Sequence, residues 1–167
     1  MQESTRKSSR GYIGEEAARE KIRHYCAYQE RCHSEVKQKL FDFGLYPEQV
    51  AELLAELIQE NYLNEERFAV QFAGGRFRMK QWGRQKIRYA LKAKGISDYC
   101  IRLALQSIPG EAYEQTLEKL AAAKWHSLRK ETQAFARQQK LRNYLLQRGF
   151  EQDLIADCIK NLTNHGG

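Results

Sequence analysis

The segment IRYALKAKGISDYCIRLAL, residues 87–105, decides the fold, because its pattern occurs twice more in the chain. The related segments are VKQKLFDFGLYPEQVAELL, residues 36–54, and LRNYLLQRGFEQDLIADCI, residues 141–159. Each segment has a glycine at its ninth position and apolar residues at matching positions before and after it. The glycines are spaced 51 and 54 residues apart and are Gly44, Gly95 and Gly149. This spacing predicts three structural repeats.

Each column of the alignment has a physical reason. Apolar residues four positions apart before the glycine form one stripe of a helix. A glycine just past that stripe suits the left-handed position that ends a helix, and the next apolar residue can fold back onto that helix. Helix start signals follow, with Ser97 as a cap in the second segment and Pro47 in the first turn of the first. Each segment therefore predicts a helix, a glycine turn and a second helix.

A further helix is predicted upstream of each pair, over residues 15–31, 65–80 and 111–128. Asn64 is a natural N-cap, and the two glutamates after it lie where the helix dipole favours carboxylates. Pro109–Gly110 marks another break. The chain is therefore predicted to be all-α, an elongated array of three tandem three-helix repeats, with nine helices in all. One compact helical bundle with coincidental spacing is the alternative.

The predicted domains follow from these breaks. Residues 1–13 form a short, loose basic tail, residues 14–63 the first repeat, residues 64–108 the second, and residues 109–167 the third. With 167 residues and few prolines, the composition suits such helices.

The positive charge is confined to the middle of the chain. The formal net charge is +7; residues 65–108 alone carry +7, whereas residues 14–64 carry −4. The stretch from 76 to 95 has eight basic residues and no acidic one: Arg76, Arg78, Lys80, Arg84, Lys86, Arg88, Lys92 and Lys94. Such a stretch is a solvated helix face, a seat for phosphates or a dock for an acidic partner. The lack of interleaved acids favours a functional contact with a polyanion or an acidic surface.

On a helix, Arg84, Arg88 and Lys92 are predicted to form a ridge beside the buried stripe. Three aromatic residues lie among the charges: Phe77, Trp82 and Tyr89. They could stack on unpaired bases, but aromatics at helical spacing usually face inward, so we expect them to pack in the core.

The chain resembles a known family at several motifs. YLNEERFA, residues 62–69, and WGRQKIRYALKAKGI, residues 82–96, resemble the central repeat of RecX, the bacterial regulator of the RecA recombinase. CHSEVKQKLFDFG, residues 32–44, and LRNYLLQRGF, residues 141–150, are similar to that family's outer repeats. The resemblance implies a cytoplasmic protein that binds the RecA–single-strand-DNA filament in its groove and inhibits strand exchange and ATP hydrolysis. It thereby implies a role in regulating recombination, DNA repair and the SOS response.

The resemblance also assigns residues. The central linker motif corresponds to Tyr62, Leu63, Glu66, Arg67 and Phe68. We expect this motif to be structural, with its apolar members bridging the first two repeats and Glu66 pairing locally with Arg67. Gly83 stands where the family frequently has proline.

Other functions find little support in the sequence. No nucleophile, phosphate loop or metal spacing follows a recognised pattern, so we expect no catalysis and no cofactor. Cys26 and Cys32 lie near two histidines, but their spacing suits buried thiols better than zinc. No apolar run is long enough for a membrane span, and no secretion signal is seen. The partners expected are the RecA filament and, by direct contact, single-stranded DNA; we expect a monomer. Two alternatives stay open: an autonomous nucleic-acid-binding module, and an adaptor for another acidic protein.

Overall fold

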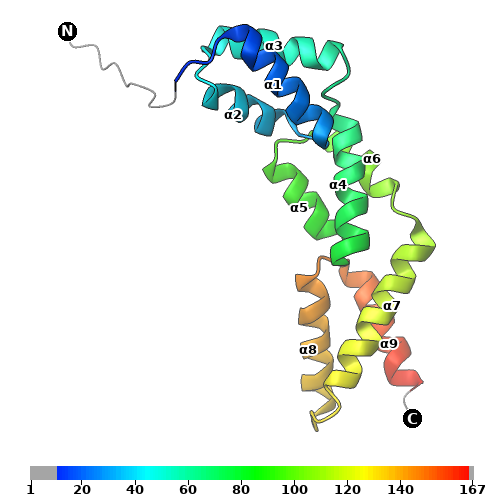
Figure 1. Ribbon diagram of the computed structural model, residues 1–167. Coiled ribbons are helices and arrows are strands. Elements are labelled where there is room, and N and C mark those ends of the chain that lie inside the picture. The colour runs from blue at the N-terminus through cyan, green and yellow to red at the C-terminus, as the bar shows by residue number, and fades with distance from the viewer. Residues whose placement is uncertain (1–10, 166–167) are drawn as a thin grey trace, which may run out of the picture. The chain divides into compact units, whose positions relative to one another are not determined.

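The computed structural model describes residues 11–165, and over this range the chain forms nine α-helices and no strand. The helices are α1 (Glu15–Tyr28), α2 (His33–Asp42), α3 (Pro47–Gln59), α4 (Glu65–Lys80), α5 (Arg84–Ala93), α6 (Asp98–Gln106), α7 (Gly110–Ser127), α8 (Ala134–Gln147) and α9 (Gln152–Asn164). Figure 1 shows these helices and the turns and loops that join them. The all-α prediction with nine helices is confirmed for this part of the chain. None of the described helices is both long and apolar enough to cross a membrane.

The three aligned glycines end helices in the same way. Their φ angles are positive, +84° at Gly44, +78° at Gly95 and +94° at Gly149. The amide after each glycine donates to the carbonyl five residues earlier, at N···O distances of 3.4, 3.1 and 3.2 Å. The glycine amide itself donates to the carbonyl three residues before it. Both bonds together define the Schellman motif, so the predicted helix ends are confirmed.

The aligned apolar columns form the cores of the repeats. All the aligned side chains are buried except Leu54, which is half-buried: Val36, Leu40, Leu45, Val50, Leu53, Ile87, Leu91, Ile96, Ile101, Ala104, Leu105, Leu141, Leu145, Phe150, Ile155, Cys158 and Ile159. Asn64 and Ser97 cap their helices through side-chain oxygens, as predicted.

The chain divides into two compact units, one ending at Phe68 and the other beginning at Ala69. In the first unit, α1, α2 and α3 pack against one another around a single core (Figure 1). α1 ends at Tyr28, three residues before its predicted end, because the Glu35 carboxylate accepts from the Cys32 amide and starts α2 there. Of the predicted basic tail, residues 1–10 lie outside the described residues. The Ile13 amide donates to the Phe43 carbonyl at 3.2 Å, so the end of that segment contacts the residue that follows α2.

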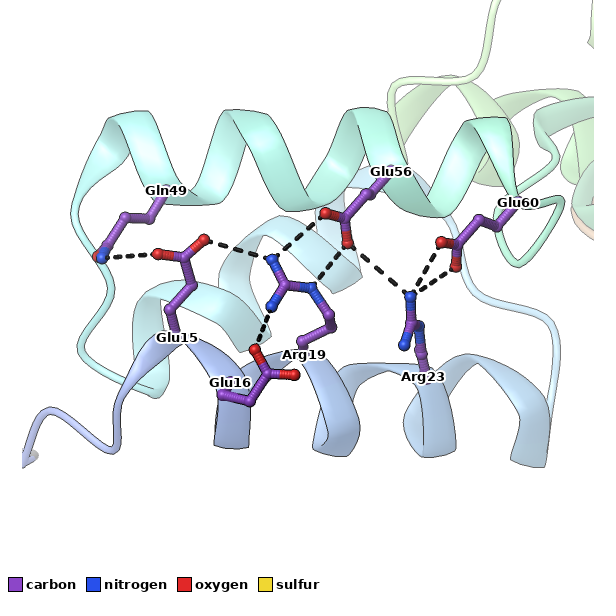
Figure 2. Close-up of polar contacts among 7 residues, drawn as sticks. All are labelled: Glu15, Glu16, Arg19, Arg23, Gln49, Glu56 and Glu60. Atoms are coloured by element: carbon purple, nitrogen blue, oxygen red, sulfur yellow. Dashed lines mark hydrogen bonds and ion pairs between the residues drawn. The ribbon is translucent and has the colours of Figure 1, made fainter.

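A polar network joins α1 and α3 on one face of the first unit. Figure 2 shows Arg19 between Glu16 of its own helix and Glu56 of α3, at 2.7 and 2.9 Å. One turn further along, Arg23 donates to both carboxylate oxygens of Glu60, each at 2.9 Å. The hydrogen bond from Arg19 lowers the pKa of Glu56. Four of the acidic residues in the negative first segment are therefore occupied here: Glu15, Glu16, Glu56 and Glu60.

The second unit brings two glycine turns into backbone contact. The Gly83 amide, before α5, donates to the Arg148 carbonyl at 2.8 Å, and the Gln85 amide donates to the Gly149 carbonyl at 2.9 Å. A Cβ atom at Gly83 would lie 2.3 Å from the Gly149 carbonyl carbon and oxygen. Only glycine allows this approach in this chain, because any Cβ at position 83 would meet these backbone atoms.

Candidate anion-binding surface

The eight basic residues of the stretch from 76 to 95, here called the basic surface, lie on the end of α4, on α5 and on the cap of α5. Five of their side chains are exposed, namely Arg78, Lys80, Lys86, Arg88 and Lys92. The other three, Arg76, Arg84 and Lys94, are half-buried. The sequence placed all eight on or next to two helices, and the structure gathers three of them, Arg76, Lys80 and Lys86, in one region of the second unit.

Trp82 is the centre of this region. It lies in the turn between α4 and α5, after Gln81, whose φ of +55° reverses the chain. Three cations surround its half-buried indole: Arg76, Lys80 and Lys86 lie 5.5, 5.6 and 4.7 Å from the ring centroid. Cation–π attraction of about 0.5–1 kcal/mol each at such partly exposed positions offsets the mutual repulsion of the cations.

A recess of about 460 Å³ opens beside this cluster, lined on one side by Trp82, Lys86 and Tyr89 and on the other by Leu146 and Gly149. Tyr89 is 81% exposed, so the prediction that it packs in the core is wrong. Phe77 is buried, as predicted. Tyr89 differs because it lies opposite the buried stripe of Ile87 and Leu91 on α5. An indole and a phenol beside cations form a surface suited to unpaired bases and phosphates.

Arg148 adds a cation that the sequence analysis did not assign. Its guanidinium donates to the Lys80 carbonyl at 2.9 Å and so binds the end of α4. Arg148 directly precedes Gly149, as Lys94 precedes Gly95, so the repeat alignment places both in one column. This shared column is the feature of the sequence that could have identified Arg148 as a candidate.

Arg84 has a structural environment, which the sequence did not indicate. Its guanidinium lies 3.7 Å from the ring centroid of Tyr113 and 3.5 Å from the Glu151 carboxylate. The fully buried Tyr113 accepts from the Arg84 amide at 3.0 Å and donates to Glu151 at 2.8 Å. Burial, the largest cause, and the neighbouring carboxylate raise the pKa of Tyr113, so it stays protonated as a donor.

The three residues of the predicted ridge, Arg84, Arg88 and Lys92, therefore have different surroundings. Arg84 is paired with Glu151, and Lys92 lies 3.5 Å from Asp98 in an exposed pair. Exposed pairs contribute little, so Lys92 stays available. Arg88 has no carboxylate partner among the described residues. It shares a recess of about 450 Å³ with Arg84 and with Arg102 of α6, a basic residue outside the predicted set.

The linker motif has a structural role. Leu63 and Phe68 are buried, and Tyr62 packs against the core of the first unit. Arg67 pairs with Glu30 and donates to the Asn61 carbonyl at 3.0 Å, so the predicted pairing with Glu66 is wrong. Glu66 is exposed in the first turn of α4. Adjacent residues of a helix point in different directions, so the side chains of Glu66 and Arg67 lie apart. Bridging of the first two repeats by this motif stays a prediction.

The cysteines are buried thiols, as predicted. Desolvation raises the pKa of Cys26 to about 11. Within residues 11–165, no cluster of three or more His, Cys, Asp and Glu side chains has the arrangement that would hold a metal ion.

Comparison with known proteins shows which family this chain is similar to. The model of the second three-helix domain of RecX matches residues 64–105, and that of the third matches residues 111–159. A regulatory protein RecX of Chlorobium limicola is 31% identical over 140 residues, which cover 81% of this chain and 84% of that protein. That of Clostridium perfringens is 32% identical over 136 residues, or 81% of this chain and 63% of that protein. That of Bacillus cytotoxicus is 28% identical over 138 residues and is matched over only 51% of its length. The chain thus spans about half to two-thirds of the length of several curated relatives.

Solved structures share the fold. A crystal structure of RecX from Lactobacillus salivarius has a TM-score of 0.80 at 23% identity, covering 89% of this chain and 96% of that one. A crystal structure of a regulatory protein RecX has a TM-score of 0.79 at 24% identity, covering 88% and 71%. At these identities the likeness concerns the fold alone.

Proposed function

Since the chain belongs to the RecX family of regulatory proteins, we propose that it binds the RecA–single-strand-DNA filament and inhibits the recombinase. The protein acts in the bacterial cytoplasm by occupying the groove of the filament. Occupancy biases assembly toward arrest or disassembly, and it lowers strand exchange and ATP hydrolysis. No catalytic residue and no cofactor take part.

One observation carries this proposal: the cluster of cations around Trp82, with Tyr89 exposed beside it. Lys80, Lys86 and Arg88 have no carboxylate partner among the described residues, so their charge is available to an external anion. Like charges gathered on one surface repel one another, and a bound polyanion relieves that repulsion. The DNA of the filament and acidic groups in its protein groove are both anions of this kind.

The basic surface is proposed to act as a group, with Arg84 in a supporting role. Because Arg84 is held by Tyr113 and Glu151, it positions the start of α5 rather than offering a free charge. Lys86 and Arg88, which follow on the same helix, are the residues that we expect to contact the partner directly.

A second candidate function is favoured by the exposed aromatics. Tyr89 and Trp82 could stack on unpaired bases, which would make the chain an autonomous nucleic-acid-binding module that coats DNA. Binding through phosphates alone loses affinity steeply with salt, with a slope in log–log form of about −0.7 per phosphate contacted on single strands. Contact with the protein groove of the filament should depend less on salt, so a salt titration separates the two functions.

The test is a titration of the chain into RecA hydrolysing ATP on single-stranded DNA, with and without added free DNA. Inhibition well below one chain per RecA that persists with added DNA is expected. Inhibition only near saturation, reversed by free DNA, would replace the proposal with DNA coating, and no inhibition would refute both.

A charge reversal locates the contact. We expect the double variant Lys86→Glu, Arg88→Glu to lose inhibition while keeping its helicity, because glutamate is a good helix former. Lys119→Glu is the matched control, an exposed reversal on α7 of the same unit, and should inhibit as the parent does. Full inhibition by the double variant would remove the basic surface from the mechanism.

A further inference from the structure

The first unit has a recess of its own, of about 710 Å³, that no feature of the sequence analysis assigned. We call it the Tyr25 recess. Its main lining side chains are Lys21, His24, Tyr25, Tyr28, Arg31 and Lys39. They come from α1, from the connection after it and from α2. No acidic residue is among the described residues that line it.

The helix geometry separates this recess from the polar network of Figure 2. At about 100° per residue, Arg19 and Arg23 lie on one side of the buried stripe of α1. Lys21 and Tyr25 lie on the other side, facing α2. Of the ten acidic residues in this segment, four lie on the first side and pair with Arg19 or Arg23, namely Glu15, Glu16, Glu56 and Glu60 (Figure 2). A net charge of −4 therefore conceals a local positive region.

Two cations are held over one ring in the recess. The guanidinium of Arg31 lies 3.8 Å from the Tyr25 ring centroid, and the ammonium of Lys39 lies 5.5 Å from it. The Nε of Arg31 also donates to the Tyr25 carbonyl at 3.3 Å, so its remaining N–H groups point away from that bond. Among the described residues, no carboxylate pairs with Lys21, Arg31 or Lys39. The arrangement fixes positive charge without neutralising it.

Tyr28, at the end of α1, completes the recess with an aromatic ring that is 84% exposed. A ring so exposed contributes little to the core. A flat aromatic beside fixed cations matches the repeating chemistry of a nucleic-acid strand, in which phosphates alternate with unpaired bases. An acidic protein surface would use the cations but would gain less from Tyr28.

We propose that the Tyr25 recess is a second binding site, for single-stranded nucleic acid, with the cations on phosphates and Tyr28 stacked on a base. The site lies in a different unit from the basic surface. It goes beyond the proposed function, because it requires neither RecA nor the cluster around Trp82.

The test measures binding of the full chain to a fluorescein-labelled oligothymidylate by anisotropy, over a range of salt concentrations. Tyr28→Ala should weaken binding by about 5-fold or more, the loss expected for one stacked base. The double variant Lys21→Gln, Lys39→Gln should also weaken binding, and it should reduce the salt slope by about 1.4 for two lost phosphate contacts. Lys37→Gln, an exposed lysine of α2 outside the recess, is the matched control and should bind as the parent does.

Inorganic polyphosphate, which has charge but no bases, serves as the second probe. Tyr28→Ala should bind it as the parent does, whereas the double lysine variant should bind it more weakly. Repeating the oligonucleotide titration in the Lys86→Glu, Arg88→Glu background keeps the two sites separate, because the effects should persist there even if the basic surface binds nothing. Thermal melting verifies that each variant is folded.

Two results would overturn the proposal. The first is oligonucleotide binding by folded Tyr28→Ala and double lysine variants that equals the Lys37→Gln control. The second is weaker binding to RecA filaments with unchanged oligonucleotide binding, which would assign the recess to a protein partner.

Discussion

The contact between Gly83 and Gly149 allows a sharp test of how the second and third repeats join. In Gly83→Ala, the new Cβ would lie 2.3 Å from the Gly149 carbonyl carbon and oxygen and 2.5 Å from the Phe150 nitrogen. These are backbone atoms, which cannot rotate away as the end of a side chain could. The two segments must separate, and separation breaks the hydrogen bonds from the Gly83 and Gln85 amides.

The expected cost combines two effects. Overpacking costs about 1–3 kcal/mol, and two backbone hydrogen bonds contribute a net of about 1 kcal/mol each. The free energy of unfolding should therefore fall by roughly 3–5 kcal/mol. For a chain of this size that corresponds to a Tm lowered by roughly 6–20 °C. Calorimetry measures the Tm, and hydrogen exchange should show loss of protection at the Gln85 amide.

Gly75→Ala is the matched control. Gly75 lies inside α4, and a Cβ there would meet nothing within 4 Å. Alanine is favoured over glycine in a helix by about 0.5–1 kcal/mol, so this variant should be slightly more stable than the parent. If Gly83→Ala kept the parent Tm and a protected Gln85 amide, the close approach of the two turns would be refuted.

Three further predictions concern buried and paired side chains. Tyr113→Phe should lower the free energy of unfolding by about 1–3 kcal/mol in denaturant titration, because the hydroxyl links two polar groups that would lose their partner. Arg67→Ala should lower the Tm clearly while Glu66→Ala leaves it nearly unchanged; equal effects would contradict the assignment of the linker motif. Glu56→Gln should be less stable than the parent at pH 7, by under about 1 kcal/mol because the pair with Arg19 is only partly buried and solvent screens it. Since the folded-state pKa of Glu56 is lowered, its contribution is present above the unfolded pKa and is lost as the pH falls through the folded value, so the two stability curves should converge in acid.

The sequence predicted the fold well because its main signal is local. Schellman ends, caps and apolar stripes all depend on residues within about ten positions of one another, as the segment from Ile87 to Leu105 illustrates. The end of α1 was predicted less accurately, because a capping box at Cys32 begins the next helix.

The candidate site was less predictable because its decisive contacts join distant positions. Glu151 is 67 residues from Arg84, so no local charge count could reveal that pair. The positive recess at Tyr25 was hidden for the opposite reason, since acids near it in sequence, such as Glu16 and Glu30, pair with arginines outside the recess. Tyr89 was missed for a third reason. Aromatics at helical spacing usually face the core, but Tyr89 lies on the exposed face of α5.

The residue just before the glycine differs between the three repeated turns of this chain. The turns are closed by their own backbone amides, so the side chain before each glycine is not needed to close the turn itself. Phe43 occupies that column in the first repeat, Lys94 in the second and Arg148 in the third. Phe43 lines the Tyr25 recess, and the two cations belong to or border the basic surface. The same position of the repeated framework thus supplies an aromatic ring in the first repeat and a positive charge in the other two.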